Sequence, residues 1–236
     1  MKRLGIVVAI AAEGRSLTKQ TITQGQFVHL PEGPLVQFSG MGSKSARLAA
    51  GRLLQNDAEA LVSWGSAGGL IPELLPGTLI LPQKVLAANG AVYSADREWH
   101  ERLCKRLEAH IDFHKGTLVE SLAVLTSSTE KTALFKRTGA VAVDMESAAV
   151  AAVAHGSGVP FVAIRAIVDP AGTIIPKSVL SAIDEFGQLR FFRFLKELLR
   201  RPMDLFALIR LGHNFRVADL SLASVACLTG SNLLAP

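Results

Sequence analysis

The chain has 236 residues, of which 49% are hydrophobic and 19% are charged, with a net charge of +5. This composition excludes a disordered chain, and two cysteines are too few for a disulfide-stabilised scaffold. The length suits either one large α/β domain or a domain plus an appendage. Cys104 and Cys227 lack zinc-site spacing and indicate reduced thiols in a cytoplasmic protein.

The first apolar run extends from Leu4 to Ala12 and follows Lys2 and Arg3, an arrangement that imitates a short secretory signal. Val and Ile dominate the run, however, which is typical of a buried strand in a parallel sheet. We therefore interpret it as the first strand. A membrane-spanning helix is not expected, because no stretch of 18 uncharged apolar residues occurs.

Short apolar runs then alternate with longer helical patterns. Strands are predicted at 4–10, 34–40, 60–65, 77–83, 116–120, 140–145 and 160–168. Helices are predicted at 43–55, 97–110, 129–137 and 146–158. This alternation predicts the α/β class, as a three-layer αβα sandwich with a central mixed, largely parallel sheet.

Beyond Pro170 the sequence changes to a loop and then to helical segments rich in Phe and Leu. We place a boundary near residue 180, between a catalytic domain (1–180) and a helical extension (181–236). Seven basic and two acidic residues fall between Arg190 and Arg216, which accounts for the whole net charge. A helix ending at Pro202 is predicted to be amphipathic, and a second one is predicted from 203 until Gly212 closes it.

Carboxylates follow three of the predicted strands: Glu13, the pair Asp144 and Glu146, and Asp169. The carboxyl ends of parallel strands form the ligand crevice of α/β sheets, so these acids are candidate functional residues. Each also has a local explanation that stays open at this point. The first three can stabilise a helix N-terminus, and an acid before Pro170 is often a turn residue.

Two glycine-rich segments, SGMGSKSA (39–46) and WGSAGG (64–69), also follow predicted strands. We interpret both as turns whose backbone N–H groups, around Gly42 and around Gly65 and Ser66, can face an anionic or hydroxyl-rich ligand. Neither is a P-loop or a dinucleotide fingerprint, and glycines at such turns are often steric requirements alone.

Taken in order and spacing, GIVVAIAAEG, SGMGSKSA, GSAGG, VDMESAA and VPFVAIRAIVDPA resemble the purine nucleoside phosphorylase and nucleosidase family. The resemblance covers about residues 4 to 172 and is strongest to 5′-methylthioadenosine/S-adenosylhomocysteine nucleosidases. It implies an enzyme that cleaves the N-glycosidic bond of an adenine nucleoside, needs no metal or cofactor, and forms a homo-oligomer.

The resemblance also implies roles for single residues. Asp169 matches the general acid at purine N7, and Glu146 matches the acid that holds the ribose hydroxyls and steadies an oxocarbenium-like sugar. Glu13 matches the residue that orients and deprotonates the attacking water. The residues expected to bind substrate are Met145, Ser66, Gly65, Gly42 and Asp144.

The chain departs from the family pattern near these residues. Val168 stands where many relatives have Ser or Thr, and no base-stacking aromatic is found around Ser127. Ser63 stands where phosphorylases of this family have an arginine, which favours water as the nucleophile. Arg15, close behind Glu13, can supply a cation to phosphate, so water and phosphate as co-substrate both stay open.

The basic tail and the IVDPAGTIIP segment resemble the hopanoid-associated phosphorylase subgroup, which removes adenine from adenosylhopane. The segment 188–216 suits an anionic membrane surface, where each basic residue contributes about 1 kcal/mol. We therefore predict a lipid-linked nucleoside substrate and a peripheral location on the inner membrane face. A nucleic-acid partner is not expected, because the basic residues are interleaved with a wide apolar face.

Three other interpretations of function stay open: a conventional methylthioadenosine/S-adenosylhomocysteine nucleosidase, another nucleosidase such as a futalosine hydrolase, and a membrane-recruited nucleoside-binding protein with little catalysis. The tail can also pack on its own core or on a sister subunit.

Overall fold

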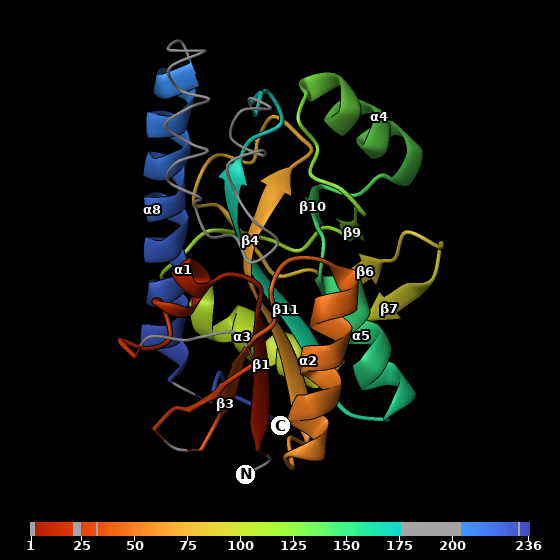
Figure 1. Cartoon of the computed structure of the whole chain (residues 1–236), viewed down its shortest axis with the longest axis vertical. Coiled ribbons are helices and arrows are strands. Elements are labelled where there is room, and N and C mark those ends of the chain that lie inside the picture. Colours follow the sequence, from red (N-terminus) through yellow and green to blue (C-terminus); the bar gives the residue numbers. More distant parts are fainter. Residues whose placement is uncertain (1–2, 21–24, 32, 176–203, 231) are drawn as a thin grey trace.

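The computed structural model describes all residues except 1–2, 21–24, 32, 176–203 and 231 (Figure 1). The predicted boundary near residue 180 and the predicted amphipathic helix that ends at Pro202 lie outside the described residues. So do five of the seven basic residues counted in the tail.

One 11-stranded sheet forms the centre of the molecule (Figure 1). Its main path has the order β2-β3-β1-β4-β10-β9-β6-β7, and β11 pairs with β4 and β5 away from this path. Antiparallel pairs join β10 to β4, β11 to β5, β2 to β3 and β6 to β7, and the other pairs are parallel. The strands are β1 (Leu4–Val8), β2 (Phe27–His29), β3 (Leu35–Phe38), β4 (Ala60–Gly69), β5 (Leu79–Ile80), β6 (Lys84–Leu86), β7 (Val92–Ser94), β8 (Phe113–His114), β9 (Leu118–Glu120), β10 (Ala142–Asp144) and β11 (Phe161–Asp169).

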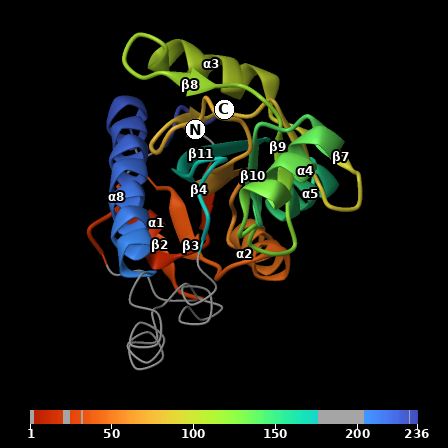
Figure 2. The same ribbon diagram turned by 90° about the horizontal axis from the view of Figure 1, so that it is seen from above.

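Helices cover both faces of the sheet, which confirms the predicted three-layer α/β fold (Figure 2). α2 and α5 pack together on one face, and α3 and α8 pack on the other. The helices are α1 (Ala11–Gly14), α2 (Ser43–Gln55), α3 (Arg97–Leu107), α4 (Ser128–Thr138), α5 (Ser147–Gly156) and α8 (Asp204–Thr229).

Small residues let the helices of one face approach the sheet closely. In α2 the buried residues Ala46, Ala49, Ala50 and Leu53 recur at helical spacing. α5 is rich in alanine, and most of its residues are buried between α2 and β4. β1 is buried at all five positions, as expected of an inner strand of a parallel sheet.

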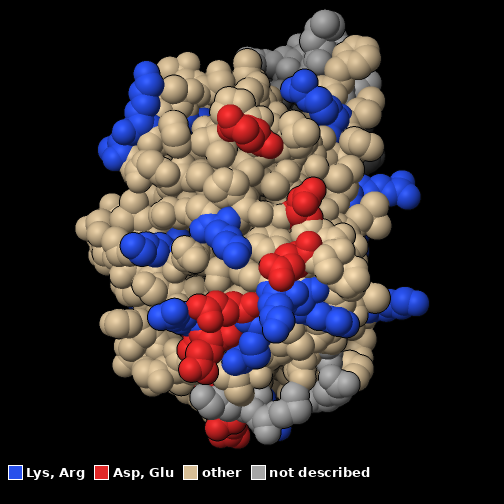
Figure 3. All heavy atoms as spheres, turned by 180° about the vertical axis from the view of Figure 1, so that it is seen from behind, with Lys and Arg blue, Asp and Glu red and all other residues tan. Residues whose placement is uncertain are grey.

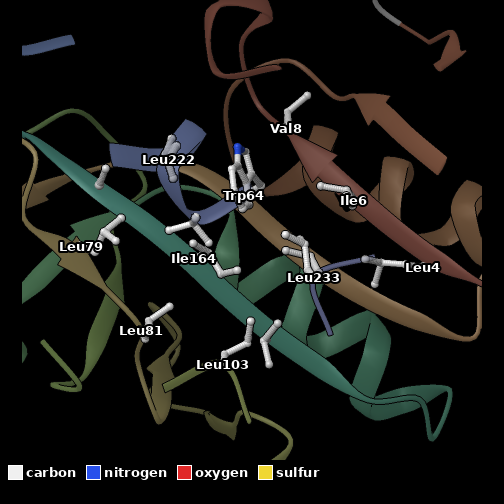
Figure 4. Packing of buried hydrophobic residues seen from close by; sticks show 14 of the residues in the cluster. Leu4, Ile6, Val8, Trp64, Leu79, Leu81, Leu103, Ile164, Leu222 and Leu233 are labelled. Carbon is white, nitrogen blue, oxygen red and sulfur yellow. The ribbon is translucent and has the colours of Figure 1, made fainter. Parts of the chain in front are cut away.

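The prediction that Gly212 closes a short helix is wrong. α8 continues through Gly212 to Thr229. A glycine inside a helix costs only about 1 kcal/mol relative to alanine, and burial of residues further along α8 outweighs this cost. Leu222 lies in the same core cluster as Trp64 of β4 and Ile164 of β11 (Figure 4).

The prediction of a turn at GSAGG is also wrong, because β4 runs through this segment to Gly69. β11 pairs with β4 along nearly its whole length and fixes the segment as strand. Four short strands, β2, β6, β7 and β8, were not predicted, because two or three residues carry too little periodicity to be recognised.

In the part of the chain that the structure describes, no helix has the length and apolar character needed to cross a membrane. Cys104 is buried and Cys227 is exposed, and neither forms a disulfide. On the face seen from behind, acidic and basic side chains are interspersed (Figure 3).

Candidate active site

The functional candidates gather around the second half of β4. β1 and β11 run parallel to β4, and β10 pairs with Gly68 and Gly69 in the antiparallel direction. This register brings the residues after β1, at the end of β10 and at the end of β11 to the same part of β4. The structure therefore groups acids that are more than 150 residues apart in the sequence.

Glu13, in α1, has a buried carboxylate that accepts four hydrogen bonds. Its Oε1 accepts from the backbone N–H of Ser66 at 2.8 Å and from Ser66 Oγ at 2.7 Å. Its Oε2 accepts from the backbone N–H groups of Ala9 and Ile10 at 3.2 and 3.3 Å. Glu13 thus has the local role at the start of α1 that its sequence position suggested, and it also contacts Ser66 of β4.

Gly65 makes room for two side chains at the centre of the site. Its φ of 150° lies in a region that side chains rarely adopt. A Cβ built on it would lie 2.6 Å from Glu13 Oε1 and 2.6 Å from Arg165 Nη1. The predicted site glycine is therefore a steric requirement, and it shows that Glu13 and Arg165 approach the same point.

Arg165 is a central residue that the sequence analysis missed. It is 1% exposed, its Nη2 lies 2.8 Å from Asp144 Oδ2, and it donates to Ser63 Oγ at 2.6 Å and to Ser147 Oγ at 3.0 Å. Its Nη1 has no hydrogen-bond partner among the described residues. A charge in the middle of the apolar run FVAIRAIV was the available signal, because a buried arginine requires partners.

Glu146 lies beside this ion pair and is itself buried. Its Oε1 accepts from the backbone N–H of Gly42 at 2.6 Å, and its Oε2 accepts from that of Met145 at 3.3 Å. Burial, and then the neighbouring Asp144 carboxylate, raise the pKa of Glu146 to about 7, although the Arg165 guanidinium and the Gly42 N–H oppose the rise. This carboxyl group therefore changes charge near neutral pH.

Asp169 stands at the end of β11, opposite Gly68 of β4. Its Oδ2 forms an ion pair of 2.6 Å with Nζ of Lys131, a residue of α4 that the sequence analysis did not single out. A Cβ on Gly68 would lie 3.0 Å from Oδ1 of Asp169, so that glycine permits the approach. Burial raises the pKa of Asp169, and the Lys131 ammonium opposes that rise.

A cavity of about 370 Å³ opens beside Glu13 and Ser66, between α1 and α8. Phe215 and Leu222 of α8 contribute apolar surface, while Arg15 and Arg216 contribute basic groups. The remaining lining residues are Ala12, Gly212, Ala218 and Asp219. The extension predicted as an appendage thus contributes a wall next to the candidate site.

Asp219, in this wall, has a raised pKa because it is partly buried, and Arg15 opposes the rise. Arg15, the predicted phosphate ligand, therefore already lies near an acidic group. Phe215, in α8, is the aromatic residue among those that line the cavity.

The described ranges contain no cluster of His, Cys, Asp and Glu side chains that could hold a metal ion. The candidate site has buried carboxyl groups, a buried guanidinium and a buried ammonium instead. Such an arrangement can move protons and stabilise a developing charge.

Comparison with known proteins agrees with this architecture. The sequence model of the phosphorylase superfamily matches residues 20–200. A 5′-methylthioadenosine/S-adenosylhomocysteine nucleosidase of Baumannia cicadellinicola subsp. Homalodisca coagulata is 30% identical over 206 residues, covering 74% of this chain and 89% of the relative.

Solved structures show the same fold over most of the chain. The nucleosidase of the same kind from Helicobacter pylori, solved with butyl-thio-DADMe-Immucillin-A, has a TM-score of 0.69 at 19% identity, covering 95% of this chain and 97% of that one. Futalosine hydrolase of Helicobacter pylori strain 26695 has a TM-score of 0.67 at 20% identity, covering 84% and 97%.

Proposed function

The chain belongs to the phosphorylase superfamily and is an enzyme that cleaves N-glycosidic bonds, and from this premise we propose that its substrate is an adenine nucleoside with a large apolar group on C5′. Adenosylhopane, a nucleoside joined to a triterpenoid, is the leading candidate, and adenine is the product released. The convergence of Glu13, Glu146 and Asp169 around β4 carries the cleavage of a nucleoside, and the cavity lined by α8 supports the apolar group.

Cleavage of an N-glycosidic bond builds positive charge on the sugar and negative charge on the base. Ionised Glu146 stabilises the positive charge on the sugar and accepts hydrogen bonds from the ribose hydroxyls. Met145, half-buried beside it, packs under the ribose ring. Asp169 neutralises the negative charge on the base by giving its proton to purine N7, so that adenine leaves as a neutral molecule. Burial supports this role, because it raises the pKa of Asp169.

The nucleophile we propose is water. Glu13, held by Ser66 at the wall of the cavity, has the carboxylate that can accept a hydrogen bond from water, and the buried Nη1 of Arg165, close to Glu13 Oε1, has no hydrogen-bond partner among the described residues. Water oxygen forms the new bond to C1′, and its proton passes to Glu13. Phosphate is disfavoured at this point, because the Glu13 carboxylate repels a second anion.

The cavity beside Glu13 is the proposed subsite for the group on C5′. Its apolar surface from Phe215, Leu222 and Ala218 supports a hydrocarbon substituent, and its rim carries Arg15 and Arg216. A volume of about 370 Å³ falls in the range of ligand sites.

Exposed apolar residues on α8 support a peripheral contact with a membrane. Phe206 is 72% exposed and Ile209 is 62% exposed, and the basic residue Arg210 is exposed next to them. A helix with apolar and basic side chains at its surface can lie on an anionic bilayer, where a lipid-linked nucleoside resides.

The test supplies purified protein with adenosylhopane in detergent and, separately, with 5′-methylthioadenosine, and measures adenine. We expect faster release from adenosylhopane. Fast cleavage of 5′-methylthioadenosine together with no cleavage of adenosylhopane would overturn the lipid assignment. Reaction in ¹⁸O-labelled water should place the label on C1′ of the sugar, whereas a sugar 1-phosphate without label would identify phosphate as the nucleophile.

A second candidate is a conventional 5′-methylthioadenosine/S-adenosylhomocysteine nucleosidase. It is supported by the 30% identity to a relative of that name over 74% of this chain. Deletion of the extension cannot distinguish the candidates, because Leu222 and Val225 of α8 are buried in the main core. The ratio of rates on the two substrates distinguishes them directly.

A further inference from the structure

Lys131 is a fully buried lysine to which the proposed reaction assigns no task. Its side chain is 0% exposed. Its Nζ contacts Asp169 Oδ2 at 2.6 Å and donates to the carbonyl oxygens of Asp169 and Pro170 at 2.9 and 2.8 Å. The three donors of the ammonium group therefore have three acceptors, all in the segment that carries the proposed general acid.

The local sequence directs Lys131 inward at some cost. Ser127 and Glu130 form a capping box that begins α4 immediately before Lys131. Leu134, one turn later on the same face, is buried against the sheet and fixes the orientation of the helix. A cation in the first turn is unfavourable for the helix dipole, and burial of an ammonium is costly. Residues that break two local rules are frequently functional.

The geometry leaves one oxygen of Asp169 for a ligand. Oδ2 forms the ion pair with Lys131 and Oδ1 takes no part in it, while both oxygens lie beside Gly68 of β4, at 3.0 and 3.2 Å from the Cβ position of that glycine. Lys131, from α4, is the charged group that acts on Asp169, and Gly68 is the residue of β4 that pairs with Asp169. The ion pair thus fixes the rotation of the carboxyl group.

We propose that Lys131 is a positioning residue that holds Oδ2 of Asp169 so that Oδ1 faces the purine, and that it stabilises the carboxylate left after proton transfer. This inference rests on the proposed function. As the C1′–N9 bond breaks, its electron pair moves to the purine and the proton on Oδ1 passes to N7. Asp169 becomes a carboxylate beside the Lys131 ammonium, and solvent returns the proton before the next turnover.

The ammonium makes the buried acid strong enough to donate. Burial alone raises the pKa of Asp169 and weakens it as an acid, and Lys131 limits that effect. A general acid works best when its pKa lies near the operating pH. Removal of Lys131 should therefore slow proton transfer and, in addition, keep Asp169 protonated to a higher pH.

The test is the pH dependence of kcat/KM for adenine release by the full-length protein and by Lys131→Met, Lys131→Gln and Lys131→Arg. In the wild type, activity falls at alkaline pH as Asp169 loses its proton. Without the lysine charge this fall should move upward by about 1 to 3 pH units. At pH values below this fall, kcat/KM of Lys131→Met and Lys131→Gln should be lower than that of the wild type. The loss should be smaller than the roughly 10²- to 10⁴-fold that general acid catalysis contributes in full. Lys131→Arg should keep the alkaline fall near its wild-type position.

Lys136→Met is the matched control, because it removes an exposed lysine from the same helix and should leave the profile unchanged. Folded Lys131→Met and Lys131→Gln variants that lose activity without moving the alkaline fall would overturn the inference, since a merely structural residue behaves in that way. So would variants with wild-type rates and profile. A wild type that releases no adenine from any adenine nucleoside would contradict the proposed function instead.

Discussion

Gly65→Ala adds one methyl group at the most crowded point of the candidate site. The new Cβ would lie 2.6 Å from Glu13 Oε1 and from Arg165 Nη1, whereas ordinary contact begins at 3.4 Å. The carboxylate, the guanidinium or the strand must therefore move by about 0.8 Å, the difference between these distances. A displacement of about 1 Å in a catalytic group can reduce the rate about 10²-fold. The φ of 150° adds backbone strain for any residue with a side chain.

We expect kcat/KM for adenine release to fall about 10²-fold in Gly65→Ala. The assay is adenine release under initial-rate conditions, with urea unfolding in parallel to correct for loss of folded protein. Gly51→Ala is the control, because nothing lies within 4 Å of its Cβ position in α2, and it should be neutral or more stable by up to about 1 kcal/mol. A folded Gly65→Ala protein with wild-type kcat/KM would refute the proposed geometry around Glu13.

Three further changes test other parts of the account. Because Glu146 must be ionised, wild-type kcat/KM should fall as the pH drops below about 7. The raised pKa means that the folded state binds this proton more tightly than the unfolded state, so the free energy of unfolding should fall as the pH rises from 4.5 to about 7. Glu146→Gln should therefore be inactive, yet more stable than the wild type at pH 8 by about 3 kcal/mol in urea titrations. Equal stability of the two proteins would argue against a buried charge. Arg165→Met should cost about 3–5 kcal/mol of unfolding free energy by leaving Asp144 unpaired, and adding Asp144→Asn should restore much of it; a double variant no more stable than the single one would contradict this pairing. Phe215→Ala should raise KM for adenosylhopane more than for 5′-methylthioadenosine, whereas Leu220→Ala, at an exposed position of α8, should change neither; equal effects of Phe215→Ala on both substrates would remove the proposed subsite.

The fold class could be predicted because its main elements carry clear local signals. β1 is a continuous apolar run rich in Val and Ile, and the buried alanines of α2 recur at helical spacing. The continuation of α8 through Gly212 could not be predicted in the same way, since burial of Leu222 and Val225 decides it rather than local propensity. Tertiary contacts likewise hold GSAGG as strand.

The acids of the candidate site could be located from the sequence because they follow strands. Their partners could not, because pairing in three dimensions defines them. Arg165 reads as one charge in an apolar strand, and Lys131 reads as an ordinary helical lysine. The place of the extension could not be located from the sequence either, because Phe215 and Leu222 reach the cavity next to Glu13 only in the folded chain.

We propose that this protein releases adenine through proton donation by Asp169. The most direct measurement compares adenine release from adenosylhopane by the wild type and by Asp169→Asn, which keeps the size of the side chain but removes its acidic proton. We expect release by the wild type and a loss of about 10²- to 10⁴-fold in a folded Asp169→Asn variant. Equal rates for the two proteins would contradict it.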